Sequence, residues 1–450
     1  MSLVVKRDID WVIDDVTGVI IGYQRKDGFT PFSEIPVIGI NTPRVLRDYT
    51  QDNTGTIFVT NVDTPATVSS EITSPWGGPG TKFTIPDGNT NCEIGLTGLG
   101  LANFDGHFAF EFYVEDYTKL SQISLLMGTT GYAKFLQNTH SVNNSDTGRF
   151  SGFHTAICGP ASTTLVSNTL NIGTDTIDAI KCRIFRVSGQ TVVLWLRRIM
   201  VVPKGRPTFV ITHDDCSSSW ISHASPLLRS YNLKADFSIE TNQLDSGPLF
   251  LTTANLLQLA NEGHRISSHN QANTPYGTQT AAEYGTAYKA ASAVLGNLLG
   301  SSFTGIYHPW VQGLTAQDVI KVLRGAGVLI ARGVQVGFNY PQVGVGGHIM
   351  QMRTQAMHTL SGLSTSEAVA KANIDAMIAT VMKYGLTATL MVHEITTNAI
   401  AVGTETRRFA YEYLLYRVAQ ECQSGYASCV TMDELYKQFN RAGAIPAAVF

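Results

Sequence analysis

The stretch TFVITHDD, residues 208–215, decides the fold, because it places a strand-like apolar run directly before three polar residues. TFVIT has the pattern of a buried strand, and it follows VPKGRP at 202–207, where the character of the sequence changes. From here to the C-terminus, apolar strands alternate with helical segments. Regular alternation of this kind is typical of a parallel β/α barrel or a doubly wound sheet.

The other strands and helices of this half can be placed from their apolar runs and end signals. Further strands are expected at 235–239, 264–268, 303–307, 327–331 and 387–392. Helices are expected at 226–230, 252–262, 280–299, 314–325, 364–384 and 409–423. Thr252 is the expected cap of one helix, and Gly263 and Gly385 stand just past the ends of two helices.

The middle of the chain, residues 51–204, has an all-β pattern. Short alternating runs are punctuated by Gly, Asn, Asp and Ser; they lie at 56–62, 107–114, 121–127, 179–186 and 191–201. Many short strands at such spacing predict a β-sandwich or jelly roll, with a carbohydrate-binding, assembly or spacer role left open. The run TVVLWLRRIMVV at 191–202 is the expected central strand, and Trp195 within it is expected in the core rather than as a platform for sugars.

The first 50 residues are short apolar runs broken by Asp, Gly and Pro. The segment 13–28 has the pattern of two small strands around a turn, with too few apolar residues for a core of its own. The sequence therefore predicts three parts: an anchor-like segment at 1–50, a β-sandwich at 51–204, and a β/α domain at 205–450.

Composition narrows the class of protein. At 450 residues the chain exceeds one ordinary core, and 44% hydrophobic with 15% charged residues suits folded domains. A net charge of -3 argues against a nucleic-acid-binding protein. The six cysteines match no C-x2-C zinc pattern, so we expect buried free thiols; a Cys422–Cys429 pair stays open.

The N-terminal sequence MSLVVKRDIDWVIDD lacks the apolar core of a signal peptide. The sequence also has no run of eighteen apolar residues, so no membrane insertion is expected. If the protein acts outside a cell, we expect it to leave by a route other than ordinary secretion.

Polar residues follow four of the predicted strands. Asp214 and Asp215 follow the strand ending at Thr212, and single histidines follow three others; these are His269, His308 and His393. The carboxyl ends of parallel strands converge on one face, so we expect these side chains around one mouth. A carboxylate, an imidazole and one further donor form a three-ligand metal site with an open position for water or a substrate carbonyl. A second carboxylate can then act as general base, and a separate histidine as general acid.

These residues resemble the NodB-like polysaccharide deacetylases, carbohydrate esterase family 4, over roughly residues 205–440. THDD at 212–215 is similar to the family's T-F-D-D, and GHRISSHNQAN at 263–273 to G-H-x-I-x-x-H-(S/T)-x-x-H. YHPW at 307–310 stands beside R-x-P-(Y/W), and MVH at 391–393 is similar to L-x-H. The stretch VTMDELYKQF at 430–439 resembles the family's closing segment.

The resemblance implies a metal-dependent hydrolase that removes an N- or O-linked acetyl group from a bacterial polysaccharide, on a distorted (β/α) barrel of the NodB type. It implies Asp214 as general base and His393 as general acid. Zinc, or another divalent ion, would be bound by a set of three residues, Asp215, His269 and Asn273. The substrate and the oxyanion would be contacted from the third motif by Tyr307, His308 and Trp310, with Tyr276 as a further wall for the acetyl methyl.

Two residues depart from the family pattern. Asn273 replaces a histidine, and because an amide oxygen is a weaker and harder donor, we predict looser zinc binding. Tyr307 stands where the family has an arginine that orients the base, and His308 or Arg332 are the candidates to replace it. The remaining histidines of this region are expected to be structural; they are His213, His223, His264, His348 and His358.

The segment VIDDVTGVIIGYQRKDG at 12–28 resembles the opening of bacteriophage tail-fibre and tailspike proteins. This resemblance implies a tailspike that modifies capsule or O-antigen, attaches to the virion through its N-terminus, and forms a homotrimer outside the host cell. Two alternatives stay open: a non-catalytic receptor-binding tail protein with a degenerate deacetylase fold, and a cellular xylan or chitin esterase.

Overall fold

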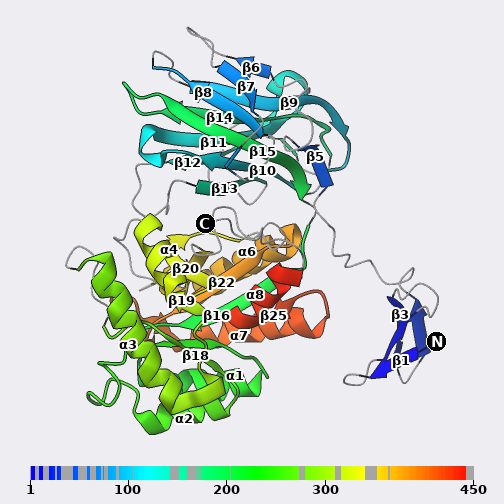
Figure 1. The fold of residues 1–450 in the computed structure, drawn as a ribbon. Coiled ribbons are helices and arrows are strands. Elements are labelled where there is room, and N and C mark those ends of the chain that lie inside the picture. The colour runs from blue at the N-terminus through cyan, green and yellow to red at the C-terminus, as the bar shows by residue number, and fades with distance from the viewer. Residues whose placement is uncertain are drawn as a thin grey trace. The chain divides into compact units, whose positions relative to one another are not determined.

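The computed structural model divides into two compact units, Met1–Asn41 and Thr42–Phe450 (Figure 1). Side chains are described at 46, 74–75, 80–87, 91–104, 106–138, 157–159, 170–171, 174–202, 204–272, 279–309, 321–334, 336–339, 352–362 and 365–439. Elsewhere, only the backbone of the strands and helices named below is described.

The first unit is an antiparallel sheet whose strands follow one another in chain order. They are β1 (Ser2–Val5), β2 (Asp10–Ile13), β3 (Ile20–Arg25) and β4 (Gly28–Pro31). The segment 13–28 was expected to form two strands, but it contains β3 and only the end residues of β2 and β4. The sheet therefore extends beyond this segment on both sides.

Two antiparallel sheets follow. One has the order β13-β10-β15-β8-β7, with β5 also paired to β15; the other has the order β12-β11-β14-β9-β6. Their strands are β5 (Arg44–Asp48), β6 (Phe58–Thr60), β7 (Thr67–Glu71), β8 (Gly80–Ile85), β9 (Asn91–Leu101), β10 (His107–Val114), β11 (Leu120–Gly128), β12 (Phe135–Ser141), β13 (Gly152–Cys158), β14 (Ile177–Arg186) and β15 (Val192–Val202).

The two sheets share one core. Phe83 and Phe110 from the first sheet belong to the same buried cluster as Leu125 and Ile184 from the second. Strand β15 is central, as predicted, because it pairs with β5, β8 and β10. Trp195 on this strand is 6% exposed and donates a hydrogen bond from Nε1 to Glu115, at 3.0 Å, so it packs in the protein instead of forming a platform.

The C-terminal part is built on a parallel sheet with the strand order β18-β17-β16-β22-β21-β20-β19, and β25 beside β16. The strands are β16 (Thr208–His213), β17 (Asp236–Ile239), β18 (Arg265–Ser268), β19 (Tyr307–Pro309), β20 (Ile330–Val336), β21 (Met352–Ala356), β22 (Thr387–Val392) and β25 (Ser428–Cys429). A parallel bridge between Ile266 of β18 and Phe303, just before β19, brings the two end strands together. The sheet is therefore close to a closed barrel.

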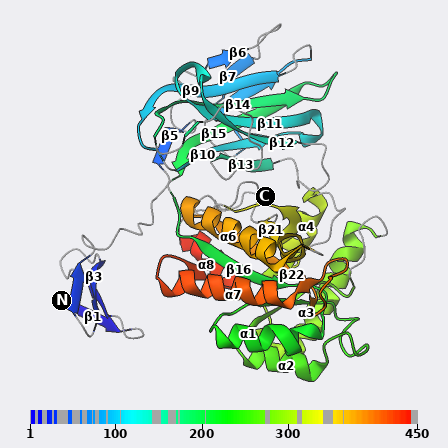
Figure 2. The ribbon, with the colours of Figure 1, turned by 180° about the vertical axis from the view of Figure 1, so that it is seen from behind.

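Helices surround this sheet (Figures 1 and 2). They are α1 (Ser225–Ser230), α2 (Thr253–Asn261), α3 (Ala281–Leu299), α4 (Ala316–Gly325), α5 (Met357–Ser361), α6 (Glu367–Tyr384), α7 (Arg408–Gln423) and α8 (Met432–Arg441). Helices α6 and α7 lie side by side, where Tyr413 donates to Asp375 at 2.9 Å. A short parallel pair, β23 (Ile395–Thr396) and β24 (Thr406–Arg407), connects β22 to α7.

Sequence signals explain where several helices begin and end. Thr252 and Thr280 each accept a hydrogen bond from the third helical residue of α2 and α3, in reciprocal capping boxes. Gly385 ends α6 in the left-handed conformation, with φ 61°. A Cβ at this position would lie 2.2 Å from the carbonyl oxygen of Gly205, so only glycine fits there.

The predicted fold class is confirmed: antiparallel sheets precede a near-barrel of parallel strands alternating with helices. Each strand predicted in this half is present, but two are displaced along the chain. The strand expected at 303–307 begins at Tyr307, and the one expected at 327–331 begins at Ile330, because a turn with Gly327 at φ 91° precedes it. Strand β21 was not predicted.

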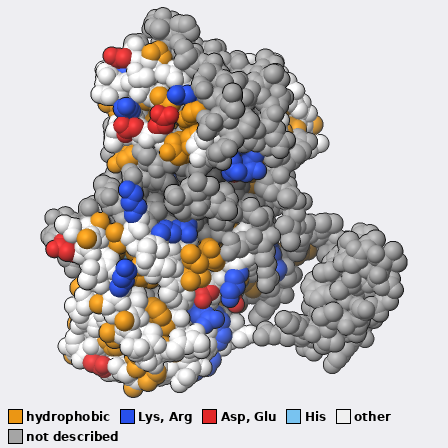
Figure 3. All heavy atoms as spheres, in the orientation of Figure 1, with side chains coloured by type: hydrophobic (Ala, Val, Ile, Leu, Met, Phe, Trp, Pro, Cys, Tyr) orange, Lys and Arg blue, Asp and Glu red, His pale blue; other side chains and the backbone are white. Residues whose placement is uncertain are grey.

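The described helices include none long and apolar enough to cross a membrane. On the face shown in Figure 3, basic and acidic side chains are scattered among uncharged and apolar ones over the described surface. The six cysteines are all free; four are buried, and Cys422 and Cys429 are half-buried. The expected free thiols are therefore present.

Candidate active site

The side chains of the candidate site follow the carboxyl ends of four parallel strands. Asp214 and Asp215 follow β16, Glu240 follows β17, His269 follows β18, and His393 follows β22. The strand register aligns these ends, since His213 pairs with Val392 and Ile239 pairs with Ser268. Residues more than 170 positions apart in the sequence are thereby brought to one edge of the sheet.

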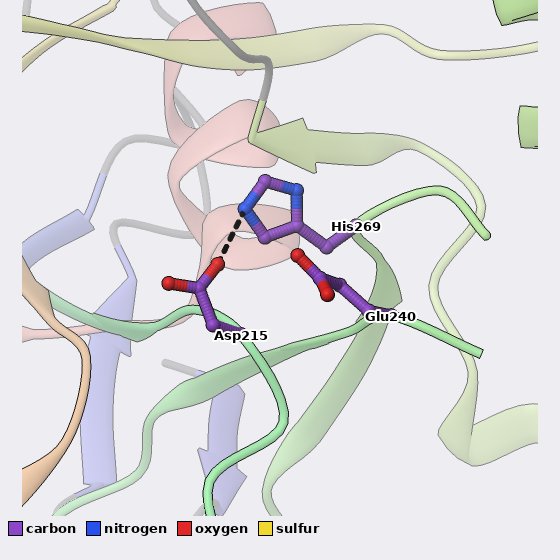
Figure 4. A group of neighbouring side chains, drawn as sticks. All are labelled: Asp215, Glu240 and His269. Atoms are coloured by element: carbon purple, nitrogen blue, oxygen red, sulfur yellow. Dashed lines mark ion pairs between the residues drawn. The ribbon is translucent and has the colours of Figure 1, made fainter. Parts of the chain in front are cut away.

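Asp215 lies between two imidazoles. Its Oδ1 is 3.4 Å from Nε2 of His269, and its Oδ2 is 3.6 Å from Nε2 of His393. Glu240 points toward the same place, and one donor atom each from Asp215, Glu240 and His269 lie within 4.8 Å of one another (Figure 4). Two carboxylates and an imidazole at such separations fit the donor preferences of a divalent metal ion.

Buried polar atoms without hydrogen-bond partners support this fit. Within the described part of the chain, four such atoms belong to the site: Oδ1 of Asp214, Oε1 of Glu240, Nδ1 of His269 and Nδ1 of His393. As whole residues, Asp214, Glu240 and His269 are 3%, 3% and 4% exposed. Because a buried polar group without a partner is costly, the site is better suited to a charged ligand than to an empty interior.

The backbone that carries the cluster is strained. Asp215, Cys216 and Asn270 adopt φ angles of 80°, 60° and 73°, in the left-handed region that non-glycine residues rarely enter. Each such residue costs about 1–3 kcal/mol and persists only where the surroundings enforce it. Here Leu251 donates to the Cys216 carbonyl at 2.9 Å, and Thr241 donates to the Asn270 carbonyl at 3.2 Å. Strain is thus concentrated beside Asp215 and His269.

Asp214 is paired with a buried arginine. Nη2 of Arg332, on β20, donates to Oδ2 of Asp214, and its Nε donates to the hydroxyl of Tyr307 at 3.3 Å. Burial alone would raise the pKa of Asp214, but the Arg332 guanidinium, with His269 and His393, holds the pKa below its ordinary value. Arg332, one of the two candidates to replace the family arginine, therefore contacts Asp214, and Asp214 is an ionised carboxylate.

Tyr307 and His308 do not face a substrate. Both are 0% exposed, and the Tyr307 hydroxyl accepts the hydrogen bond from Arg332. His308 is bonded through both ring nitrogens, to the Ser268 carbonyl at 2.7 Å and to the Tyr284 hydroxyl at 2.6 Å. Burial lowers the pKa of His308 to about 3, so its ring is neutral. The expectation that these two side chains contact substrate is corrected: both support the site from within the protein.

Glu240 is the residue that sequence reasoning missed. Burial, followed by the nearby carboxylates of Asp215 and Asp214, raises its pKa to about 8. It stands directly after the predicted strand ADFSI, in the same position relative to its strand as the predicted residues. The criterion that identified His269 and His393, a polar residue directly after a predicted strand, also applies to Glu240.

The structure also places the histidines expected to be structural. His213 is fully buried, stacks on Phe237 and shares a hydrogen bond with the Tyr411 hydroxyl at 3.0 Å. Nδ1 of His264 accepts from the Ala235 backbone at 3.4 Å. His358 lies nearer the site, with its ring centroid 5.9 Å from that of His393. His348 lies outside the described residues.

The predicted residues Asp214, Asp215, His269 and His393 therefore meet at one place. Asn273 and Trp310, with Tyr276, lie outside the described residues. The backbone carbonyl of His393 accepts a hydrogen bond from Nε1 of Trp220 at 2.6 Å, and this bond fixes the start of the loop that follows β22.

Residues 202–331 match the family model for polysaccharide deacetylase. The chain thus carries a polysaccharide deacetylase domain, from a family of hydrolases that act on acetyl groups. Among curated proteins, no match was found.

Similar solved structures include the Xyl-CE4 domain of a multidomain xylanase from the hindgut metagenome of Trinervitermes trinervoides, at 16% identity and TM-score 0.35, covering 54% of this chain and 95% of that one. A family 4 acetyl xylan esterase from Clostridium thermocellum, in complex with a cobalt ion, has 13% identity and TM-score 0.33, covering 51% and 90%. The chitin deacetylase of Colletotrichum lindemuthianum has 13% identity and TM-score 0.35, covering 52% and 89%.

Proposed function

We propose that this polysaccharide deacetylase domain is catalytically active, depends on a divalent metal ion, and hydrolyses N- or O-linked acetyl groups of a bacterial surface polysaccharide. The observation that carries the proposal is the convergence of Asp214, Asp215, His269 and His393 at one sheet edge, with Asp214 ionised beside Arg332. Together these side chains provide a metal-binding pair, a base and an acid.

Asp215 and His269 would hold the ion, which we propose is Zn²⁺, and Asn273 is proposed as a further ligand. When bound, the ion polarises the acetyl carbonyl and lowers the pKa of its water. The strained backbone at Asp215 and Asn270 fixes both strand ends before any ion arrives. The protein thus presents its donors in a set arrangement, and little reorganisation is needed on binding.

Asp214 is the proposed general base. Its Oδ2 is held by Arg332, while Oδ1 has no hydrogen-bond partner within the described region. A carboxylate fixed through one oxygen can accept a proton from water through the other. Tyr307 assists indirectly, since its hydroxyl accepts from Arg332 and orients the guanidinium.

His393 is the proposed general acid. It faces Asp215 from the strand beside β16, so a substrate acetyl group at the cluster would lie between His393 and His269. His393 would donate a proton to the departing amine or alcohol. Trp310 is proposed to border the acetyl methyl and to offer its backbone N–H to the oxyanion.

Acetate release from defined acetylated glycans tests this function. The panel should include capsule and O-antigen fragments, xylan and chitin oligomers, with N- and O-acetyl groups at known positions. Active protein should release acetate, stop after treatment with a chelator, and recover on addition of a divalent ion. Absence of release from every substrate, with the ion bound, would favour a receptor-binding protein that has lost its chemistry.

We further propose that the protein works as a homotrimeric phage tailspike, attached to the virion through its N-terminus and located outside the host cell. The tail-fibre-like segment 12–28 and the order of small sheet, β-sandwich and hydrolase support this proposal. Light scattering of the full chain should give three times the 48.8 kDa chain mass. A monomer at all concentrations would contradict the trimer.

A further inference from the structure

We infer that Glu240 is a metal ligand of this chain, so that the ion is held by two carboxylates and an imidazole, from Asp215, Glu240 and His269. The inference rests on the proposed metal dependence of the site, and it adds a ligand from a strand that carries none of the recognised motifs. It also makes the donor set richer in carboxylate oxygens.

Position and distance are the first argument. Glu240 directly follows β17, between β16 and β18 in the sheet, and those strands lead to Asp215 and His269. The donor atoms of the three residues lie within 4.8 Å of one another, and all three side chains point to a common centre (Figure 4). Donors that share an ion with bonds near 2.1 Å are separated by roughly 3–4 Å, so only a small movement is needed.

One carboxylate oxygen of Glu240 is buried and has no hydrogen-bond partner within the described residues. Glu240 is 3% exposed, and its Oε1 has no hydrogen bond to any described residue. Neither does it form an ion pair with a basic side chain in the described ranges. A structural glutamate at this depth would normally be held by a cation or by several donors.

Charge balance is the third argument. The carboxylates of Asp214, Asp215 and Glu240 converge, and the guanidinium of Arg332 is directed at Asp214. A divalent cation supplies the two positive charges that balance Asp215 and Glu240. The site as a whole then becomes neutral, which suits a group that is almost fully buried.

The donor set predicts an ion preference. Carboxylate oxygens suit harder ions such as Mn²⁺, whereas imidazoles favour Zn²⁺ and its softer neighbours. A set with two carboxylates should therefore bind Mn²⁺ more strongly, relative to Zn²⁺, than an imidazole-rich set would. Removing the negative charge of Glu240 should weaken Mn²⁺ binding more than Zn²⁺ binding.

The test measures metal binding directly. Metal-free full-length protein is titrated with Mn²⁺, followed by the EPR signal of free Mn²⁺, and with Zn²⁺, followed by calorimetry. Glu240→Gln keeps the shape of the side chain and removes its charge. Glu394→Gln makes the same change at an exposed residue beside His393 and is the matched control.

We expect one ion per chain in the wild type and in Glu394→Gln, and Mn²⁺ binding about 100-fold weaker or more in Glu240→Gln, since even outer-shell changes cost 10–100-fold. Wild-type affinity in Glu240→Gln would overturn the ligand role and leave the proposed function standing. A wild type that binds no ion would overturn both.

A measurement on the wild type covers the case in which Glu240→Gln does not fold. Protein labelled with ¹³C only in its glutamate carboxyl groups is compared by infrared difference spectroscopy with and without Mn²⁺. A metal-induced shift of one labelled carboxylate band is expected. Unchanged labelled bands on a sample with bound Mn²⁺ would exclude Glu240 from the ligands.

Discussion

At the scale of single residues, the Asp214 carboxylate separates proton transfer from metal binding. We predict that Asp214→Asn lowers kcat for acetate release by about 10²–10⁴-fold, because the amide cannot accept the proton from water. The ion should remain bound, since Asp214 is paired with Arg332 and is not the proposed ligand. Single-turnover acetate release with parallel metal analysis checks this, and an unchanged kcat would remove Asp214 from the mechanism.

The Arg332–Asp214 pair is almost completely excluded from solvent, with 1% and 4% of the two side chains exposed. We predict that Arg332→Met lowers the free energy of unfolding by about 3–5 kcal/mol, because it leaves a buried carboxylate uncompensated. Tyr307→Phe, which removes only the hydroxyl that Arg332 contacts, should cost about 1 kcal/mol. Urea unfolding of both variants checks the ranking, and equal losses would show that the ion pair is not what Arg332 contributes.

Four site residues could be predicted because each stands where a recognisable apolar strand ends. Arg332 could not be assigned with certainty, because it lies inside the strand that begins at Ile330. The face of the sheet to which its side chain points depends on the pairing register of that strand, which the sequence does not reveal. Glu240 has the same strand-end position as the others, but it belongs to none of the recognised family motifs. The left-handed turns at Asp215 and Asn270 have only a weak sequence signal, because Asp and Asn enter this region more readily than other non-glycine residues but less readily than glycine.

At the scale of secondary-structure elements, the turn between α6 and β22 sets the position of the strand that leads to His393. We predict that Gly385→Ala lowers stability by more than about 2 kcal/mol, since it adds a clash with the Gly205 carbonyl to the cost of a left-handed alanine. Gly425→Ala is the matched control, because that glycine has φ 80° and open space around it. It should cost about 1–2 kcal/mol. Similar melting temperatures for the two variants would contradict the account.

Helices were predicted more accurately than strands, for physical reasons. Capping residues mark helix ends locally: the structure confirms the predicted cap at Thr252, and Thr280 caps α3 in the same way. Strand ends depend on pairing with distant neighbours, so β19 and β20 begin three or four residues later than their apolar runs suggest. Strand β21 has the polar sequence MRTQA, which gives no apolar signal.

At the scale of the whole molecule, buried histidines make stability depend on pH. Burial lowers the pKa values of His107, His213, His264 and His308 to about 4, 3, 4 and 3. In the unfolded chain these groups titrate near about 6.5, so between pH 6.5 and 4 the unfolded state binds protons that the folded state does not. The free energy of unfolding is therefore greatest above pH 6.5 and should fall as the pH drops.

Denaturant unfolding at pH 7, 6 and 5 measures this fall, with a slope that approaches about 1.4 kcal/mol per pH unit for each histidine that titrates. His213→Gln, which cannot titrate but can still pair with the Tyr411 hydroxyl, should have a shallower slope. A stability that does not change across this range would show that these histidines are protonated in the folded protein.

The central claim is that side chains from separate strands share one metal-centred pocket, and anomalous diffraction from crystals soaked in Mn²⁺ or Zn²⁺ tests it most directly. The account predicts one strong anomalous peak about 2.0–2.2 Å from donor atoms of Asp215 and His269, with Asp214 and His393 on either side. A peak elsewhere, or no peak at an ion concentration that saturates the protein in solution, would contradict it.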